Sequence, residues 1–140
     1  MNRKQRIRLG ALVLAAGMLV ATSAYGSGSQ AKLTIRHQIR GCHSWSFNGA
    51  AYKPSLKIKL AAGTTLAVTN NDVMPHKLIQ LSGAKLHIVS PNMNHMSATA
   101  KVTFVKKGTY RITTKAGEDY MQGMKTIGAD NVLRLSVTVS

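Results

Sequence analysis

The chain has 140 residues, with 19 lysines and arginines against 4 acidic residues, so its net charge is +15 when the histidines are neutral. This length suits a single domain, alone or with a targeting segment, and is too short for most multidomain enzymes. A hydrophobic share of 44 % excludes a wholly disordered chain. The single cysteine excludes an intramolecular disulfide framework and a four-cysteine zinc site.

The N-terminus has the three parts of a secretory signal peptide. A basic stretch, MNRKQRIRLG, precedes the apolar run ALVLAAGMLVA, and the small and polar residues TSAYGSGSQ follow. An uncleaved membrane anchor is the alternative, but the apolar run is shorter than the roughly 20 residues that span a bilayer. We therefore expect a signal peptide at 1–26, a domain at 27–140, and a secreted, periplasmic or cell-envelope location.

The positive charge belongs mainly to the expected domain. The leader holds four of the 19 basic residues and no acid, which leaves 15 basic against 4 acidic residues, or +11. An exported domain of this charge is expected to meet an anionic envelope surface or an acidic protein, and no nucleic acid. A charge that serves only solubility is the alternative.

Apolar and polar residues alternate with a period of two along most of the domain, which is typical of half-buried strands. Short segments with turn residues between them predict an all-β fold, a Greek-key β-sandwich of about eight strands. The expected strands lie at residues 32–40, 56–60, 65–69, 76–81, 85–89, 100–104, 110–114 and 133–139.

Four longer connections, at 40–54, 70–75, 90–98 and 116–130, alternate with tight turns, so they are expected to share one pole of the sandwich. Residues that can bind metals concentrate in or beside these connections: Cys42, His43, His76, Met93, His95, Met96 and Glu118. Thiolate, thioether and imidazole ligands together suit copper, whereas zinc and iron sites do not call for methionines. The alternative for each residue is structural: a buried thiol, a core or surface histidine, or methionine packing.

Two segments resemble the cupredoxin family. Residues 70–78, NNDVMPHKL, look like the loop and strand start that deliver the family's first histidine ligand, which would be His76 here. Residues 108–112, GTYRI, look like the strand that precedes the family's ligand loop. The resemblance implies a plastocyanin- or azurin-type sandwich that binds copper.

The loop before the last strand departs from this family. Cupredoxin electron carriers usually place Cys, His and often Met there, but residues 116–131 contain neither Cys nor His. We therefore expect a relocated site, with Cys42 as the thiolate, His76 as one imidazole and His95 or His43 as the second. Met96, Met93 or Glu118 would be a weaker ligand.

Two functions follow from such a site: a single-electron carrier, or a protein that handles copper for delivery, storage or protection. The expected partners are a copper ion and an acidic redox or copper-transfer protein. A metal-free cationic module that binds the cell envelope is the alternative function. An enzyme is not expected, because adjacent residues such as Cys42 and His43 point to opposite faces of a strand and make a poor nucleophile–base pair.

Overall fold

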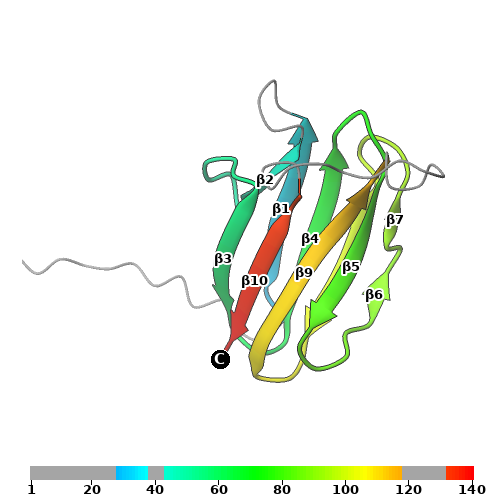
Figure 1. The fold of residues 1–140 in the computed structure, drawn as a ribbon. Helices are drawn as coiled ribbons and strands as arrows, with labels where there is room; N and C mark the ends of the chain where they lie inside the picture. Colours follow the sequence, from blue (N-terminus) through cyan, green and yellow to red (C-terminus); the bar gives the residue numbers. More distant parts are fainter. Residues whose placement is uncertain (1–27, 38–42, 118–131) are drawn as a thin grey trace, which may run out of the picture.

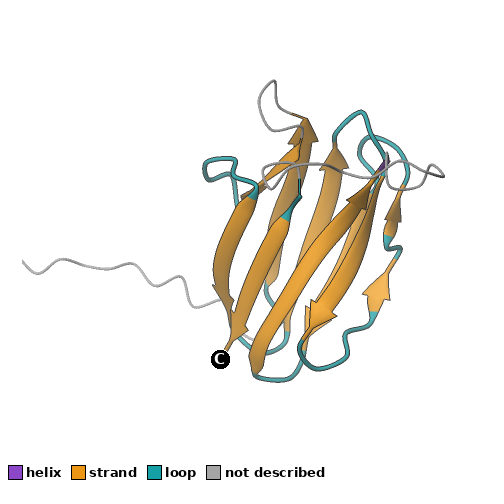
Figure 2. Cartoon of the chain, viewed as in Figure 1, coloured by secondary structure: helices purple, strands orange, loops and turns teal. Residues whose placement is uncertain are grey.

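Two five-stranded sheets pack face to face in the computed structural model, which describes residues 28–37, 43–117 and 132–140 (Figures 1 and 2). The ten strands are β1 (Gln30–His37), β2 (His43–Phe47), β3 (Ser55–Leu60), β4 (Thr64–Asn71), β5 (His76–Ser82), β6 (Ile88–Val89), β7 (Asn92–Met93), β8 (Thr99–Phe104), β9 (Gly108–Ala116) and β10 (Arg134–Val139). The expected all-β sandwich is confirmed.

The chain passes from one sheet to the other at most of its connections. One sheet has the order β2-β1-β4-β8-β6 and the other β3-β10-β9-β5-β7. Each sheet is mixed, because β1 is parallel to β4 and β3 is parallel to β10, while the other pairs are antiparallel. The strands β2 and β7 lie inside segments that were expected to be long connections, and the expected strand at 85–89 is reduced to the two residues of β6.

The core follows from the period-two pattern that predicted the strands. Leu33 and Ile35 of β1 are fully buried on the inner face, as are the inward side chains of β4, β8, β9 and β10. Trp45 of β2 is also fully buried, and the rings of Phe104 and Tyr110 meet edge to face with centroids 5.1 Å apart. Burial of each large apolar side chain contributes about 1.5–3 kcal/mol to stability. The alternation of apolar and polar residues therefore determines which face of each strand packs inward.

One pole of the sandwich gathers the ends of strands from both sheets. The strands β1, β4 and β9 end at the upper pole in Figure 1, where β2 and β5 begin. The end of β4, which leads into the 72–75 connection, lies there beside the 94–98 connection, because the Asn70 carbonyl accepts a hydrogen bond from the Ser97 amide and the Asn70 amide donates to the Ala98 carbonyl. Parts of two expected pole loops lie here: the start of β2, inside the expected 40–54 loop, and the 72–75 connection, inside the expected 70–75 loop. The segments 38–42 and 118–131, like the expected leader, lie outside the described residues.

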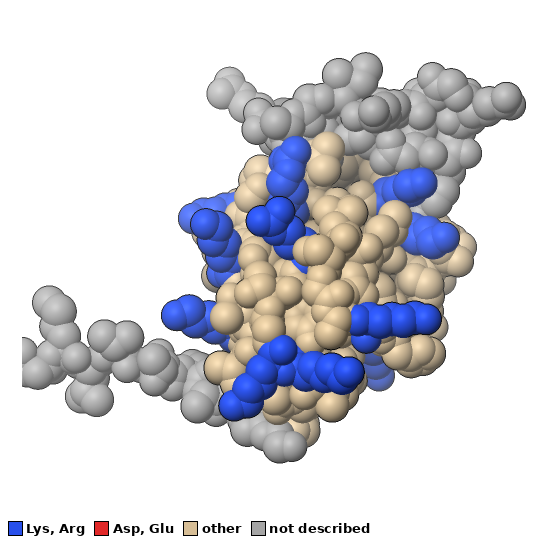
Figure 3. Space-filling view, turned by 60° about the horizontal axis from the view of Figure 1, so that its bottom comes forward, with Lys and Arg blue, Asp and Glu red and all other residues tan. Residues whose placement is uncertain are grey.

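The surface of the described part of the chain is strongly cationic. Its 13 lysines and arginines face one acidic residue, Asp72, which is fully buried. Figure 3 accordingly shows blue side chains spread over the visible face and no red ones. Within the same residues, no helix has the length and apolar character needed to cross a membrane.

Candidate metal centre

Two histidines face each other across the hairpin of β1 and β2. His37 is the last residue of β1, His43 is the first residue of β2, and the two are Cα partners in the antiparallel pair. Their rings lie 6.2 Å apart between centroids. The His43 side chain is buried, whereas 47 % of the His37 side chain is exposed. The pair therefore extends from the interior of the pole to solvent.

Asp72 directly follows β4, and hydrogen bonds with residues close to it in the chain hold it in place. The side-chain oxygen of Asn70 accepts the Asp72 amide at 2.9 Å, and the Asn70 side-chain amide donates to the carbonyls of Met74 and Met93 at 2.9 and 3.0 Å. The Oδ1 atom of Asp72 in turn accepts the Met74 amide at 3.0 Å. Asn and Asp side chains that bond the backbone two residues on are typical of turns. Here they fix the carboxylate at the centre of the pole.

The Asp72 carboxylate joins histidines from the two sheets. Its Oδ2 atom lies 2.7 Å from Nδ1 of His43 and 3.1 Å from Nε2 of His76, the first residue of β5. An ionised carboxylate only accepts hydrogen bonds, so both ring nitrogens donate to it. In a neutral His76 ring, Nδ1 is then the acceptor, and the hydroxyl of Thr114 on β9 donates to it at 3.0 Å.

These contacts keep Asp72 ionised. Burial by itself raises the pKa of the carboxyl, but the hydrogen bonds from His43, His76 and the Met74 amide, with the charge interaction at His76, outweigh it. The net result is a pKa well below the ordinary range of an aspartate. The pole therefore holds one buried negative charge among three imidazole rings.

The spacing of these groups suits a metal ion. One ligand atom from each of His37, His43 and Asp72 lies within 4.8 Å of the others, and His37 Nδ1 is 3.7 Å from Asp72 Oδ1. The His43 and His76 rings are perpendicular, with centroids 4.7 Å apart. Ligands at about 2.0–2.1 Å from one ion lie about 2.9–3.4 Å apart at angles between 90° and the tetrahedral value. The distances of 2.7 and 3.1 Å around Asp72 Oδ2 are close to that range.

The structure brings together some of the residues expected from the sequence. His76 and His43 both contact Asp72, and Met93 is buried as the Cα partner of His76 between β5 and β7. His95 and Met96 are exposed on the 94–98 connection, where the Nδ1 atom of His95 donates to the Met96 carbonyl at 2.8 Å. Cys42 and Glu118 lie outside the described residues, so their expected ligand roles stay predictions.

Sequence reasoning missed two members of the cluster, Asp72 and His37. Asp72 was taken as part of an Asn-Asn-Asp turn, and His37 as an inward residue before the first loop. One sequence signal pointed to Asp72: it is the only acidic residue among the first 117. A lone carboxylate four residues before a histidine, in a strongly basic chain, is a candidate partner for that histidine.

No family model matches the chain, and no curated protein matches its sequence. Among solved structures, it is similar to a purple cupredoxin from Nitrosopumilus maritimus, with 20 % identity, coverage of 78 % of this chain and 98 % of that one, and a TM-score of 0.46. Amicyanin from Paracoccus versutus has 17 % identity, coverage of 76 % and 79 %, and a TM-score of 0.39. A cysteine protease inhibitor from Entamoeba histolytica has 10 % identity, coverage of 82 % and 100 %, and a TM-score of 0.45.

Cupredoxins are thus among the structures that this chain resembles, as the sequence predicted. Because the TM-scores lie below 0.5, the description of the fold rests on the strand pairing above, and the argument about the site rests on this chain's own residues.

Proposed function

We propose that the protein is an exported copper-binding protein whose metal site lies where His37, His43 and His76 surround Asp72, a region called the histidine pole below. The observation that carries this proposal is the convergence of His37, His43 and His76 on the buried Asp72 carboxylate. Imidazole and carboxylate ligands suit several divalent metals, and Cu²⁺ forms the most stable complexes among the first-row ions at such sites. A site of mainly nitrogen and oxygen ligands favours Cu²⁺ over Cu⁺.

The contacts among these side chains support the proposal. His43 Nδ1 donates to Asp72 Oδ2 at 2.7 Å, and both atoms could bind a metal ion once that ring proton is released. His76 Nε2 would be a further ligand if it gave up its hydrogen bond to Asp72, and the hydroxyl of Thr114 would hold the ring in orientation through Nδ1. His37 completes the set from the solvent side.

The half-exposed His37 favours a role in copper handling, because a ligand that solvent reaches allows the ion to exchange. Electron transfer is the second candidate, and one sequence feature favours it. Cys42 directly precedes His43, so a thiolate in this site would be one residue from a buried imidazole. An intense visible absorption band that disappears in Cys42→Ser would support the electron carrier.

The test is equilibrium dialysis of the purified protein against Cu²⁺, with metal measured per chain. We expect one tightly bound ion, and binding at least about tenfold weaker in His37→Gln, since each imidazole ligand contributes directly to affinity. His87→Gln removes an exposed histidine outside the pole and is the matched control. Since His37 is half exposed, its substitution is expected to leave the fold intact.

Three outcomes would contradict the proposal: no bound copper above background, equal loss in His37→Gln and His87→Gln, or wild-type affinity in both His37→Gln and His43→Gln. In those cases the histidine–aspartate network is a structural device alone. The metal-free cationic module would then be the better account of this basic surface.

A further inference from the structure

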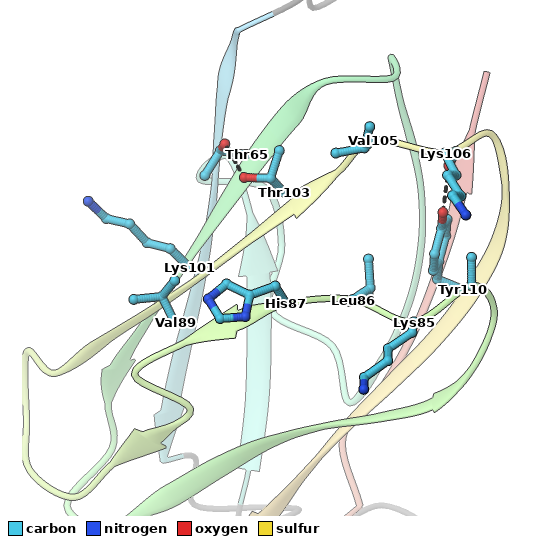
Figure 4. A pocket seen from close by; sticks show the side chains of 11 residues that line it. Thr65, Lys85, Leu86, His87, Val89, Lys101, Thr103, Val105, Lys106 and Tyr110 are labelled. Carbon is cyan, nitrogen blue, oxygen red and sulfur yellow. Dashed lines mark hydrogen bonds between the residues drawn. The ribbon is translucent and has the colours of Figure 1, made fainter.

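A second site lies away from the histidine pole, in a cleft between the segment 84–89 and the outer face of β4 and β8. The cleft has a volume of about 400 Å³, within the range of small-molecule sites. Figure 4 shows Thr65, Thr103 and Val105 along one side, with Val89, His87 and Leu86 along the other. None of these residues contributes to the proposed copper site.

The wall formed by the 84–89 segment is fixed by a single glutamine. The Gln80 side chain accepts the Leu86 amide at 2.9 Å and donates to the Ala84 carbonyl at 2.7 Å. Gly83 packs so closely on β9 that an added Cβ would lie 2.7 Å from Tyr110 Cδ1 and 2.8 Å from the Thr109 carbonyl oxygen. The cleft is therefore preformed, and binding does not have to order this wall.

Aliphatic groups line the interior of the cleft. Val105 is 71 % exposed, Val89 is 49 % exposed, and Leu86 lies half buried beside them, so all three offer apolar surface to a ligand. The hydroxyls of Thr65 and Thr103 bond to each other at 2.8 Å across the β4–β8 pair. Because these hydroxyls already bond to each other, they have fewer hydrogen bonds to offer a ligand. Burial of an apolar group against this lining is therefore favourable.

Lysines surround this apolar lining. Lys101 is the Cα partner of Val89 in the β6–β8 pair, and Lys85 and Lys106 border the other end of the cleft (Figure 4). All three are exposed, and the one acidic residue in the described part of the chain, Asp72, is buried. A ligand with a negative head group and an alkyl body complements both features of the cleft.

We propose that this cleft binds an anionic amphiphile, with its alkyl chain against Val89, Leu86 and Val105 and its phosphate or carboxylate among Lys85, Lys101 and Lys106. The proposal is independent of copper. The same chemistry is offered by a free alkyl phosphate or fatty acid and by an anionic phospholipid in a bilayer, and the experiment separates these sources.

The opposite sheet provides an internal control. A broader groove over β3, β9 and β10 also carries three cations, Lys57, Arg111 and Arg134. The double variant Lys57→Gln/Lys59→Gln replaces two exposed lysines of β3, the first of which lines this groove, and changes the net charge by the same amount as Lys85→Gln/Lys101→Gln. Likewise, Leu81→Asn alters an exposed aliphatic residue outside the cleft and matches Val105→Asn inside it.

The first experiment is calorimetric titration of the metal-free protein with monomeric decyl phosphate, with inorganic phosphate and decyl maltoside as separate probes. We expect saturable binding of decyl phosphate and much weaker binding of the other two. Lys85→Gln/Lys101→Gln should weaken binding about fivefold or more, because two exposed charge contacts are lost. Val105→Asn should also weaken it, whereas the two control variants should match the wild type.

Equal binding of inorganic phosphate and decyl phosphate would overturn the proposal, since it would show simple attraction of anions. Equal loss in the cleft and control variants would overturn it as well. The second arm adds vesicles containing phosphatidylglycerol. Vesicle binding that Lys85→Gln/Lys101→Gln reduces more than the control supports a phospholipid ligand, whereas cleft-dependent binding of decyl phosphate alone supports a free amphiphile.

Discussion

The histidine pole and the lysine-bordered cleft differ in the sign and the burial of their charges. At the pole, the Asp72 charge is fully buried and accepts hydrogen bonds from two histidine rings and a backbone amide. At the cleft, the charges of Lys85, Lys101 and Lys106 are exposed beside aliphatic side chains. A buried charge is stable only when groups of the same fold pair with it, whereas an exposed charge is solvated and can pair with a ligand.

This difference separates the expected effects of substitution. Changes at the buried Asp72, His43 and His76 should affect both folding stability and metal binding, because the same contacts serve both. Changes among the cleft lysines should affect ligand binding and leave stability almost unchanged. The following predictions test this distinction in order of decreasing effect on stability.

Asp72→Asn should destabilise the metal-free protein by about 2–4 kcal/mol, because buried hydrogen bonds to a charged group are lost and donors remain unsatisfied. The comparison is urea denaturation of the wild type and the variant at neutral pH. Lys59→Gln, which changes an exposed charge on β3, is the control. A loss below about 0.5 kcal/mol, the range of ordinary surface substitutions, would show that Asp72 does not organise the pole.

The contribution of Asp72 should also depend on pH. Its pKa is lowered in the folded protein, so the folded state binds fewer protons than the unfolded state as the pH falls. The stabilisation is fully present above the unfolded pKa of about 4 and is lost as the pH decreases toward the folded pKa. Denaturation of wild type and Asp72→Asn across this interval should therefore converge at low pH. A constant difference from neutral pH downward would contradict the lowered pKa.

Gly83→Ala should destabilise the fold by about 1–3 kcal/mol, because Gly83 has a φ of +104° and its added methyl group would collide with β9. Gly49→Ala is the matched control: φ is +79° there, but no atom lies within 4 Å of the added Cβ. Thermal or urea unfolding should show the larger loss for Gly83→Ala. Equal losses would mean that the contact with Tyr110 does not constrain the cleft wall.

Lys101→Gln should change the stability by less than about 0.5 kcal/mol, because Lys101 is exposed and substitutions at exposed positions usually have effects of that size. The same urea denaturation measures it, alongside Asp72→Asn. A loss comparable to that of Asp72→Asn would remove the distinction between the two regions.

The sequence predicted the layers of the fold better than their detailed pairing. Alternation located β1, β3, β4, β5, β8, β9 and β10 because inward positions such as Leu33 and Val137 are apolar wherever the strands pair. It did not predict β2, whose buried His43, Ser44 and Ser46 interrupt that pattern. Nor did it predict β7, which has only two residues and exists through its pairing with β5.

The candidate site shows the same limit. His43 and His76 were chosen because of their residue type and their place at strand ends, which are local properties. The role of Asp72 depends on β1, β2, β4 and β5 meeting at one pole, which a single segment cannot reveal. A turn sequence such as Asn-Asn-Asp satisfies local backbone geometry and hides that long-range contact.

The most direct test of the copper site is pulsed electron paramagnetic resonance of the Cu²⁺-loaded protein, prepared with ¹⁵N-labelled histidine. We predict coupling of the copper to at least two imidazole nitrogens, with a reduced number in His37→Gln and in His43→Gln and an unchanged spectrum in His87→Gln. A spectrum without imidazole coupling, or one that neither pole substitution alters, would contradict a copper site built on His37, His43, His76 and Asp72.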